Sequence, residues 1–231
     1  MIDYNEILTV MFGNKFQITE KNNIITGHGT YAEHAFALFG VVNEAMLDNQ
    51  MSLDLADFVI QQPAKTNFLI ILDTGGQQAT HQAELLGLNR YYAHLIKALH
   101  FKRHQECRVF ALVIGKALGG AFIATALNAQ RIYALPSAQI SVMWLEAMSR
   151  VTKIPLAKLQ ELSKTSPIFA PGAENFYLLG AVAEILSAEK IMSTLINTIN
   201  LPTLLGDWRS NGFERGGRKL SAPIVEAVLR A

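Results

Sequence analysis

Residues 107–135, CRVFALVIGKALGGAFIATALNAQRIYAL, constrain the possible fold more than any other stretch of the chain. The apolar run over 108–114 predicts a buried strand, and a glycine-bearing turn is expected over 115–120. A helix over 121–129 and a further strand over 131–135 should follow. This order aims backbone N–H groups, at the positive start of a helix, into the space above the sheet. Such a corner can hold a developing negative charge, which points to acyl or enolate chemistry.

A similar unit precedes it. The sequence NFLIILD over 67–73 predicts another buried strand, and TGGQ over 74–77 is expected to form the turn that closes it. A long helix should begin near Thr80 and end in the basic segment 102–104. Strand, helix and strand in this order form a βαβ unit, so we predict an α/β fold with a mostly parallel sheet and right-handed crossovers.

Shorter segments complete the expected architecture. Alternating or apolar pieces predict strands over 15–20, 24–29, 35–42 and 139–143. Ser52 is expected to cap a helix that ends near residue 62. Further helices are predicted over 145–152, 155–163, 173–179, 187–199 and 222–229. A single domain over residues 1–231 with a helical C-terminal part is the simplest interpretation.

Composition narrows the possible partners and compartment. Half of the 231 residues are hydrophobic and only 17% are charged, so we expect part of the surface to be hidden against another subunit. A net charge of +1 gives no basis for binding nucleic acid or an anionic membrane. The single cysteine, Cys107, excludes an internal disulfide and fits a reducing compartment. With no signal-peptide pattern at the N-terminus and no membrane-spanning run, a cytoplasmic protein is predicted.

Several segments carry a family resemblance. FLIILDTGGQ, VIGKALGGAF and RIYALPSAQISVM resemble the crotonase-like fold in its carboxyltransferase branch. MSRVTKIPLAKLQELS and FAPGAENFYLLG are similar to the gamma subunit of biotin-independent malonate decarboxylase. The resemblance covers residues 65–180 best. It implies that the chain pairs with a related beta subunit and that the two decarboxylate a malonyl thioester on an acyl carrier protein. The thiol would belong to a CoA-like prosthetic group on that carrier, so no cofactor bound by this chain is expected.

Loss of CO2 from a malonyl thioester leaves an enolate, whose oxygen needs hydrogen-bond donors rather than a general base. We predict that two glycine pairs supply catalytic main-chain amides, Gly119–Gly120 and Gly75–Gly76. For the second pair, a plain strand-to-helix turn remains an open alternative. Four neighbouring residues are expected to bind the substrate: Thr74, Gln77, Lys116 and Ala121. An outward-pointing side chain is the alternative for Lys116.

Other chemistries are disfavoured. Hydratases of the superfamily carry a glutamate where this chain has Ile123, and the peptidase branch carries a serine near the position of Gly119. Neither residue can perform the corresponding acid–base or nucleophilic step. His100 and His104 have the i, i+4 spacing of metal ligands, but basic neighbours and no convergent carboxylate indicate a solvated helix end. No metal is expected.

Two alternative functions remain open at this point. The chain could be the carboxyltransferase subunit of a biotin-dependent carboxylase or decarboxylase, which shares the fold and both glycine segments. It could also be a non-catalytic structural partner of the beta subunit. The polar segment 202–219 is expected to be a solvated tail, although Arg215, Arg218 and Lys219 could instead meet an acidic carrier.

Overall fold

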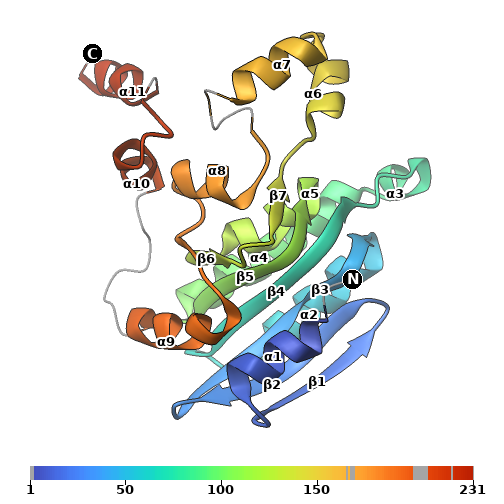
Figure 1. The fold of residues 1–231 in the computed structure, drawn as a ribbon. Coiled ribbons are helices and arrows are strands. Elements are labelled where there is room, and N and C mark those ends of the chain that lie inside the picture. The colour runs from blue at the N-terminus through green and yellow to red at the C-terminus, as the bar shows by residue number, and fades with distance from the viewer. Residues whose placement is uncertain (1–2, 165, 167–169, 200–207, 220, 231) are drawn as a thin grey trace.

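The computed structural model describes residues 3–164, 166, 170–199, 208–219 and 221–230. A sheet of eight described strands forms its centre, with helices on both faces (Figure 1). In sheet order the strands are β1 (Phe16–Lys21), β2 (Ile24–Tyr31), β3 (His34–Leu47), β4 (Asn67–Gln77), β5 (Arg108–Leu118), β6 (Arg131–Ala134) and β8 (Glu184–Ile185), and β7 (Gln139–Ser141) pairs with β5. The β1–β2–β3 pairs are antiparallel and all the others are parallel. This arrangement confirms the predicted fold class.

Helices bury both faces of the central strands. One face is covered by α2 (Asn49–Gln61), α4 (Leu88–His104) and α5 (Gly119–Ala124), and the other by α1 (Tyr4–Phe12) and α9 (Ala188–Ile199). Side chains along β4 alternate between the two cores: Phe68 and Ile70 belong to the first, and Leu69 and Ile71 to the second. Because both faces are dry, the central strands have unbroken apolar sequences rather than alternating ones.

β4 and β5 extend beyond their predicted ends, through residues 74–77 and 115–118. The turns expected there are therefore wrong, because β4 remains hydrogen-bonded to the long strand β3 as far as Gln77. Glycine suits these strand ends because neighbouring backbones approach closely. A Cβ atom on Gly75 would lie 2.7 Å from the carbonyl oxygen of Glu44. β4 therefore includes Gly75 and Gly76, whereas β5 ends directly before Gly119.

Several helix boundaries also differ from expectation. Asp48, rather than Ser52, caps α2, and its carboxylate accepts a main-chain N–H of the first turn at 2.7 Å. The long helix expected from Thr80 is divided at Gly87, where φ is +83°, into α3 (His81–Leu85) and α4. A glycine can adopt this left-handed conformation without the steric penalty of a Cβ atom.

Three elements were not predicted, namely α1, β8 and α10 (Trp208–Glu214). The helix expected over 121–129 is the shorter α5, followed by the 3-10 turn η1 (Ala126–Asn128). The remaining predicted helices are confirmed as α6 (Leu145–Thr152), α7 (Leu156–Ser163), α8 (Ala173–Leu178), α9 and α11 (Ser221–Arg230). Within the described residues, no helix has the length and apolar character needed to cross a bilayer.

Residues 208–219 pack against α8 and the chain after it, so the expected solvated tail is wrong for this part; residues 202–207 lie outside the described residues. The Arg215 guanidinium donates at 2.8–3.2 Å to three carbonyl oxygens, those of Tyr177, Val182 and Ala183. It also lies 4.0 Å from the centroid of the Tyr177 ring. Arg218 donates through Nε to the carbonyl oxygen of Leu179 at 2.9 Å. We call residues 208–219, together with residues 177–183 that they contact, the C-terminal clamp.

Candidate active site

The two predicted glycine pairs lie side by side at the carboxyl ends of β4 and β5. We call Gly75, Gly76, Gly119 and Gly120 the glycine edge. A Cβ atom on Gly76 would be 3.6 Å from the carbonyl oxygen of Leu118, the residue before Gly119, which places the two strand ends side by side. In open α/β sheets, ligands bind outside the carboxyl ends of the strands. The structure therefore brings the two candidate anion-holding segments to one place.

Gly119 and Gly120 form the corner between β5 and α5. Gly119 has a φ of +54°, a backbone conformation that L-residues with a Cβ atom rarely adopt. A Cβ atom at Gly119 would also overlap Oε1 of Gln77. The main-chain N–H of Gly120 donates to that same oxygen at 2.6 Å. The corner thus presents a main-chain donor that already holds a carbonyl oxygen.

The Gly75–Gly76 pair is more enclosed. The N–H of Gly76 donates to the hydroxyl of Thr74 at 3.2 Å, and that hydroxyl donates to the carbonyl oxygen of Ala45 at 2.7 Å. Thr74 is fully buried. In this structure its side chain supports the backbone of the strand end, and its expected contact with substrate stays a prediction.

The buried carboxylate of Asp73 links the strands that carry the glycine edge. Asp73 is 1% exposed, and its two oxygens accept the main-chain N–H groups of Lys116 at 2.7 Å and Glu44 at 3.3 Å. Asp73 therefore connects β3, β4 and β5 one residue before the first glycine segment. The side chain of Lys116 forms an ion pair with Glu44 at the surface. This matches the outward orientation weighed for Lys116; its expected substrate contact stays a prediction.

Other residues fix the position of the corner. Ala121 is fully buried, and its carbonyl oxygen accepts the Thr125 hydroxyl at 2.6 Å.

Tyr92 lies against Gly120, since a Cβ atom there would be 3.3 Å from the tyrosine ring. Its hydroxyl donates to the carbonyl oxygen of Leu47 at 2.7 Å. Burial, reinforced by the charge of Asp48, raises the pKa of Tyr92, so the phenol stays protonated. The sequence alone did not indicate that Tyr92 belongs to the site.

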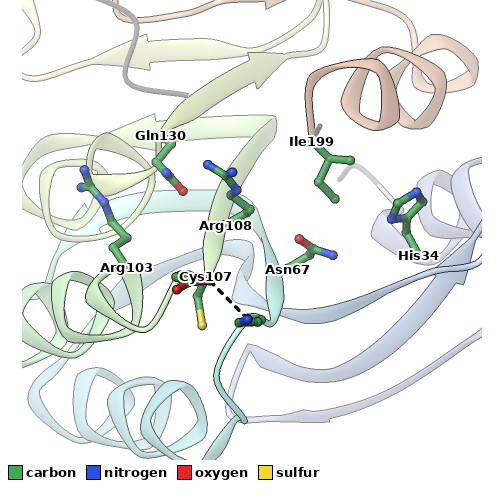
Figure 2. A pocket seen from close by; sticks show the side chains of 9 residues that line it. His34, Asn67, Arg103, Cys107, Arg108, Gln130 and Ile199 are labelled. Atoms are coloured by element: carbon green, nitrogen blue, oxygen red, sulfur yellow. Dashed lines mark ion pairs between the residues drawn. The ribbon is translucent and has the colours of Figure 1, made fainter. Parts of the chain in front are cut away.

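A separate cavity of about 530 Å³ lies at the opposite end of the sheet (Figure 2). Asn67 and Arg108, the first residues of β4 and β5, line it, as do Arg103 and Cys107. Burial lowers the pKa of Arg103 from its usual value. The cavity is separated from the glycine edge by the length of β4, so it is not part of the same site.

The two histidines at the basic end of α4 have the spacing of metal ligands. Within the part of the chain that the structure describes, no three His, Cys, Asp or Glu side chains group together as a metal site would require. His100 and His104 are both exposed at the end of α4.

Comparison with known proteins decides the family. A model of the malonate decarboxylase gamma subunit (MdcE) matches residues 28–231. The chain belongs to this family. The match extends well beyond residues 65–180, which carried the resemblance in sequence. The mostly parallel sheet flanked by helices confirms the crotonase-like fold expected from the sequence.

Several known proteins resemble this gamma-subunit family member. A malonyl-S-ACP:biotin-protein carboxyltransferase from Malonomonas rubra is 34% identical over 176 residues, or 70% of this chain. The match spans 60% of that relative's own length. A chain of the Pseudomonas malonate decarboxylase hetero-tetramer in complex with coenzyme A has a TM-score of 0.75 at 18% identity, with 96% of this chain and 97% of that chain covered.

Two further structures define the breadth of the fold. A chain of the Pseudomonas MdcD–MdcE hetero-dimer has a TM-score of 0.74 at 21% identity, with 96% of both chains covered. Transcarboxylase 12S, solved with methylmalonyl-coenzyme A and methylmalonic acid bound, has a TM-score of 0.70 at 19% identity over 84% of this chain and 40% of that one. At these identities the likeness establishes the fold alone.

Proposed function

We propose that this chain, together with a beta subunit, decarboxylates a malonyl thioester carried by an acyl carrier protein. Membership of the gamma-subunit family supports this activity. The observation that carries it is the Gly119–Gly120 corner, whose Gly120 N–H holds a carbonyl oxygen at 2.6 Å. A thioester oxygen is of similar size and also accepts hydrogen bonds. The corner therefore has the donor that an enolate requires.

The chemistry needs little beyond that donor. The bond between the carboxylate carbon and the α-carbon breaks, and its electron pair moves into the thioester to form an enolate as CO2 departs. A proton from water or from an acidic group of the complex then adds to the α-carbon and gives the acetyl thioester. A preorganised donor in a site shielded from water stabilises the transition state by about 3 kcal/mol. The CoA-like prosthetic group of the carrier would present the thioester, so this chain contributes position and main-chain donors.

Exposed apolar side chains surround the glycine edge. They follow the strand and helix ends on this side of the sheet, and they include Met46 (56% exposed), Leu86 (59%), Ile123 (39%), Val142 (48%) and Trp144 (39%). Large apolar side chains gathered at a site are typical of a surface that another protein covers. We propose that the beta subunit covers this edge. Its contact would exclude water and strengthen the hydrogen bonds to the enolate.

A second function is favoured by one specific observation. The relative from Malonomonas rubra is a carboxyltransferase whose acceptor is a biotin protein. In that case the same corner would steady the ureido oxygen of carboxybiotin. The two activities differ in mass balance. Release of free CO2 without biotin supports the decarboxylase, whereas inhibition of the complex by avidin supports the carboxyltransferase.

Replacement of Gly120 tests the proposal. Gly120→Pro removes the N–H, and proline is tolerated in the first turn of a helix. In the complete complex with the beta subunit and malonyl carrier, kcat should fall about 100- to 1000-fold, the usual cost of losing one such donor. Gly120→Ala is the matched control: it keeps the N–H, although its Cβ atom would lie 3.3 Å from Gln77 and Tyr92, which is a tight contact, so kcat should fall far less than in Gly120→Pro.

Size-exclusion chromatography with the beta subunit should show that both variants still assemble. If assembled Gly120→Pro turns over like the wild type, the chain does not stabilise the enolate at this corner. A purely structural role beside the beta subunit would then be the better description.

A further inference from the structure

The donor at the corner is already occupied. Gln77 is the last residue of β4, and its side chain folds across to the other glycine pair. Its Oε1 atom lies 2.6 Å from the main-chain nitrogen of Gly120. The same oxygen fills the space beside Gly119 that a Cβ atom would need. A carbonyl oxygen of the protein therefore sits where the proposed function places a carbonyl oxygen of the substrate.

Only the side chain of Gln77 has to move to vacate this position. The backbone on either side of it is fixed, because Gln77 pairs with Leu47 of β3 and the N–H of Gln78 donates to the carbonyl oxygen of Leu47 at 2.9 Å. The side chain itself is exposed. Rotation about its own bonds withdraws the oxygen without a change in the sheet.

The strength of the competing acceptors decides when the exchange occurs. An amide oxygen is a better acceptor than a neutral thioester oxygen, because nitrogen donates more electron density to the carbonyl than sulfur does. An enolate oxygen is charged, and hydrogen bonds to charged acceptors are roughly twice as strong as neutral ones. The amide oxygen of Gln77 therefore competes well with the bound substrate and poorly with the oxygen that develops as CO2 leaves.

We infer that Gln77 is an internal stand-in for the substrate oxygen and is displaced from Gly120 during decarboxylation. This inference rests on the proposed function. Gln77 acts here as a positioning residue that keeps the donor ordered in the resting site. Its hydrogen bond must be broken before the enolate can take its place, which lowers kcat/KM below the value that an open corner would give.

Gln77→Met tests the inference, because methionine has a similar length and lacks the amide oxygen. A net hydrogen bond of ordinary strength corresponds to about a fivefold effect, so kcat/KM of the complete complex should rise about fivefold, with a lower KM. Gln77→Ala should give the same direction of change without the bulk of methionine. Gln78→Met, on the neighbouring exposed glutamine, is the matched control and should leave both constants unchanged.

Spectra of the complex labelled with ¹⁵N-glycine in this chain give an independent readout. The Gly120 amide signal should shift in Gln77→Met, since its acceptor is gone. It should shift again when a malonyl-pantetheine analogue with a sulfonate in place of the carboxylate, which cannot lose CO2, is added. A fall or no change in kcat/KM for both Gln77 variants would overturn the inference.

The two readouts separate the inference from the proposed function. If the analogue shifts the Gly120 signal of Gln77→Met while kcat/KM is unchanged or lower, the corner binds substrate and only the role of Gln77 is wrong. If the analogue saturates the complex and leaves the Gly120 signal in place, the proposed function fails, and the inference fails with it.

Discussion

The glycine edge and the C-terminal clamp both depend on glycine, but for different reasons. At the edge, the missing side chains at Gly119 and Gly120 leave room for the oxygen of another group beside a main-chain donor. In the clamp, Cβ atoms at Gly180, Gly212 and Gly217 would overlap neighbouring carbonyl oxygens of the protein itself. The glycines of the edge leave room for a ligand, whereas the glycines of the clamp let two backbone segments of the protein pack directly against each other. A glycine-rich sequence alone does not distinguish these cases.

The arginines of the clamp also have a role that their sequence does not reveal. The sequence from 212 to 219 contains basic residues that could meet an acidic carrier. In the structure, Arg215 and Arg218 donate to main-chain carbonyl oxygens around α8 instead. Their guanidinium groups donate hydrogen bonds to carbonyl oxygens at the end of this short helix and in the chain after it.

The largest expected effect comes from adding one methyl group in the clamp. Gly180→Ala places a Cβ atom against the carbonyl oxygen of Trp208 at a φ of +88°, and the main-chain nitrogen of Gly212 would lie only 2.7 Å from it. We expect a loss of about 3 kcal/mol of unfolding free energy and a melting temperature lower by roughly 6–12 °C, with kcat of the surviving complex unchanged. Thermal unfolding and single-turnover assays on the same preparation measure both quantities.

Gly119→Ala is the matched change at the edge. Its Cβ atom meets only the tip of the Gln77 side chain, which can rotate away, so the positive φ should cost about 1 kcal/mol. Here kcat should fall, because the methyl group occupies the place of the ligand. Equal losses of stability and equal kcat in the two alanine variants would erase the proposed difference between the regions.

A second test sharpens the role of the clamp arginine. Arg215→Met leaves three carbonyl oxygens without their charged donor, so the unfolding free energy should fall by about 2 kcal/mol in chemical denaturation. Lys219→Met, on an exposed neighbour, should have little effect on stability. Affinity for the acyl carrier protein should stay within twofold in both variants. A large loss of affinity for the carrier protein in both variants would instead indicate that Arg215 and Lys219 form part of its docking surface.

The smallest effect concerns the tyrosine beneath Gly120. Tyr92→Phe removes the hydrogen bond to the Leu47 carbonyl oxygen and should cost about 1 kcal/mol at neutral pH, with kcat almost unchanged. Burial raises the pKa of Tyr92, so the folded protein keeps a proton that the unfolded chain loses above about pH 10. The wild type should therefore lose stability more steeply than Tyr92→Phe as the pH rises above 10. Parallel slopes would show that Tyr92 is not buried as described.

Local patterns predicted the central sheet well, because β4 and β5 are buried on both faces and their apolar runs admit few alternatives. They failed at the strand ends, since the extension of β4 to Gln77 depends on pairing with β3, far away in sequence. The nine-residue α1 was missed because so short an amphipathic helix has little signal of its own.

The candidate site was also predictable only in part. Motif resemblance indicated the glycine pairs, whereas the contacts that shape them join residues distant in the chain. Asp73 accepts the N–H of Lys116 across 43 positions, and Gln77 reaches Gly120 across another 43. No spacing rule predicts such partners. Only the burial of Asp73 between three strands reveals that it connects them.

The most direct test is a structure of the complex with its beta subunit and the sulfonate analogue of malonyl-pantetheine. We predict that the thioester oxygen lies 2.7–3.1 Å from the main-chain nitrogen of Gly120 and that Oε1 of Gln77 is withdrawn. A thioester oxygen bound away from both glycine pairs of this chain, with Gln77 still on Gly120, would contradict it.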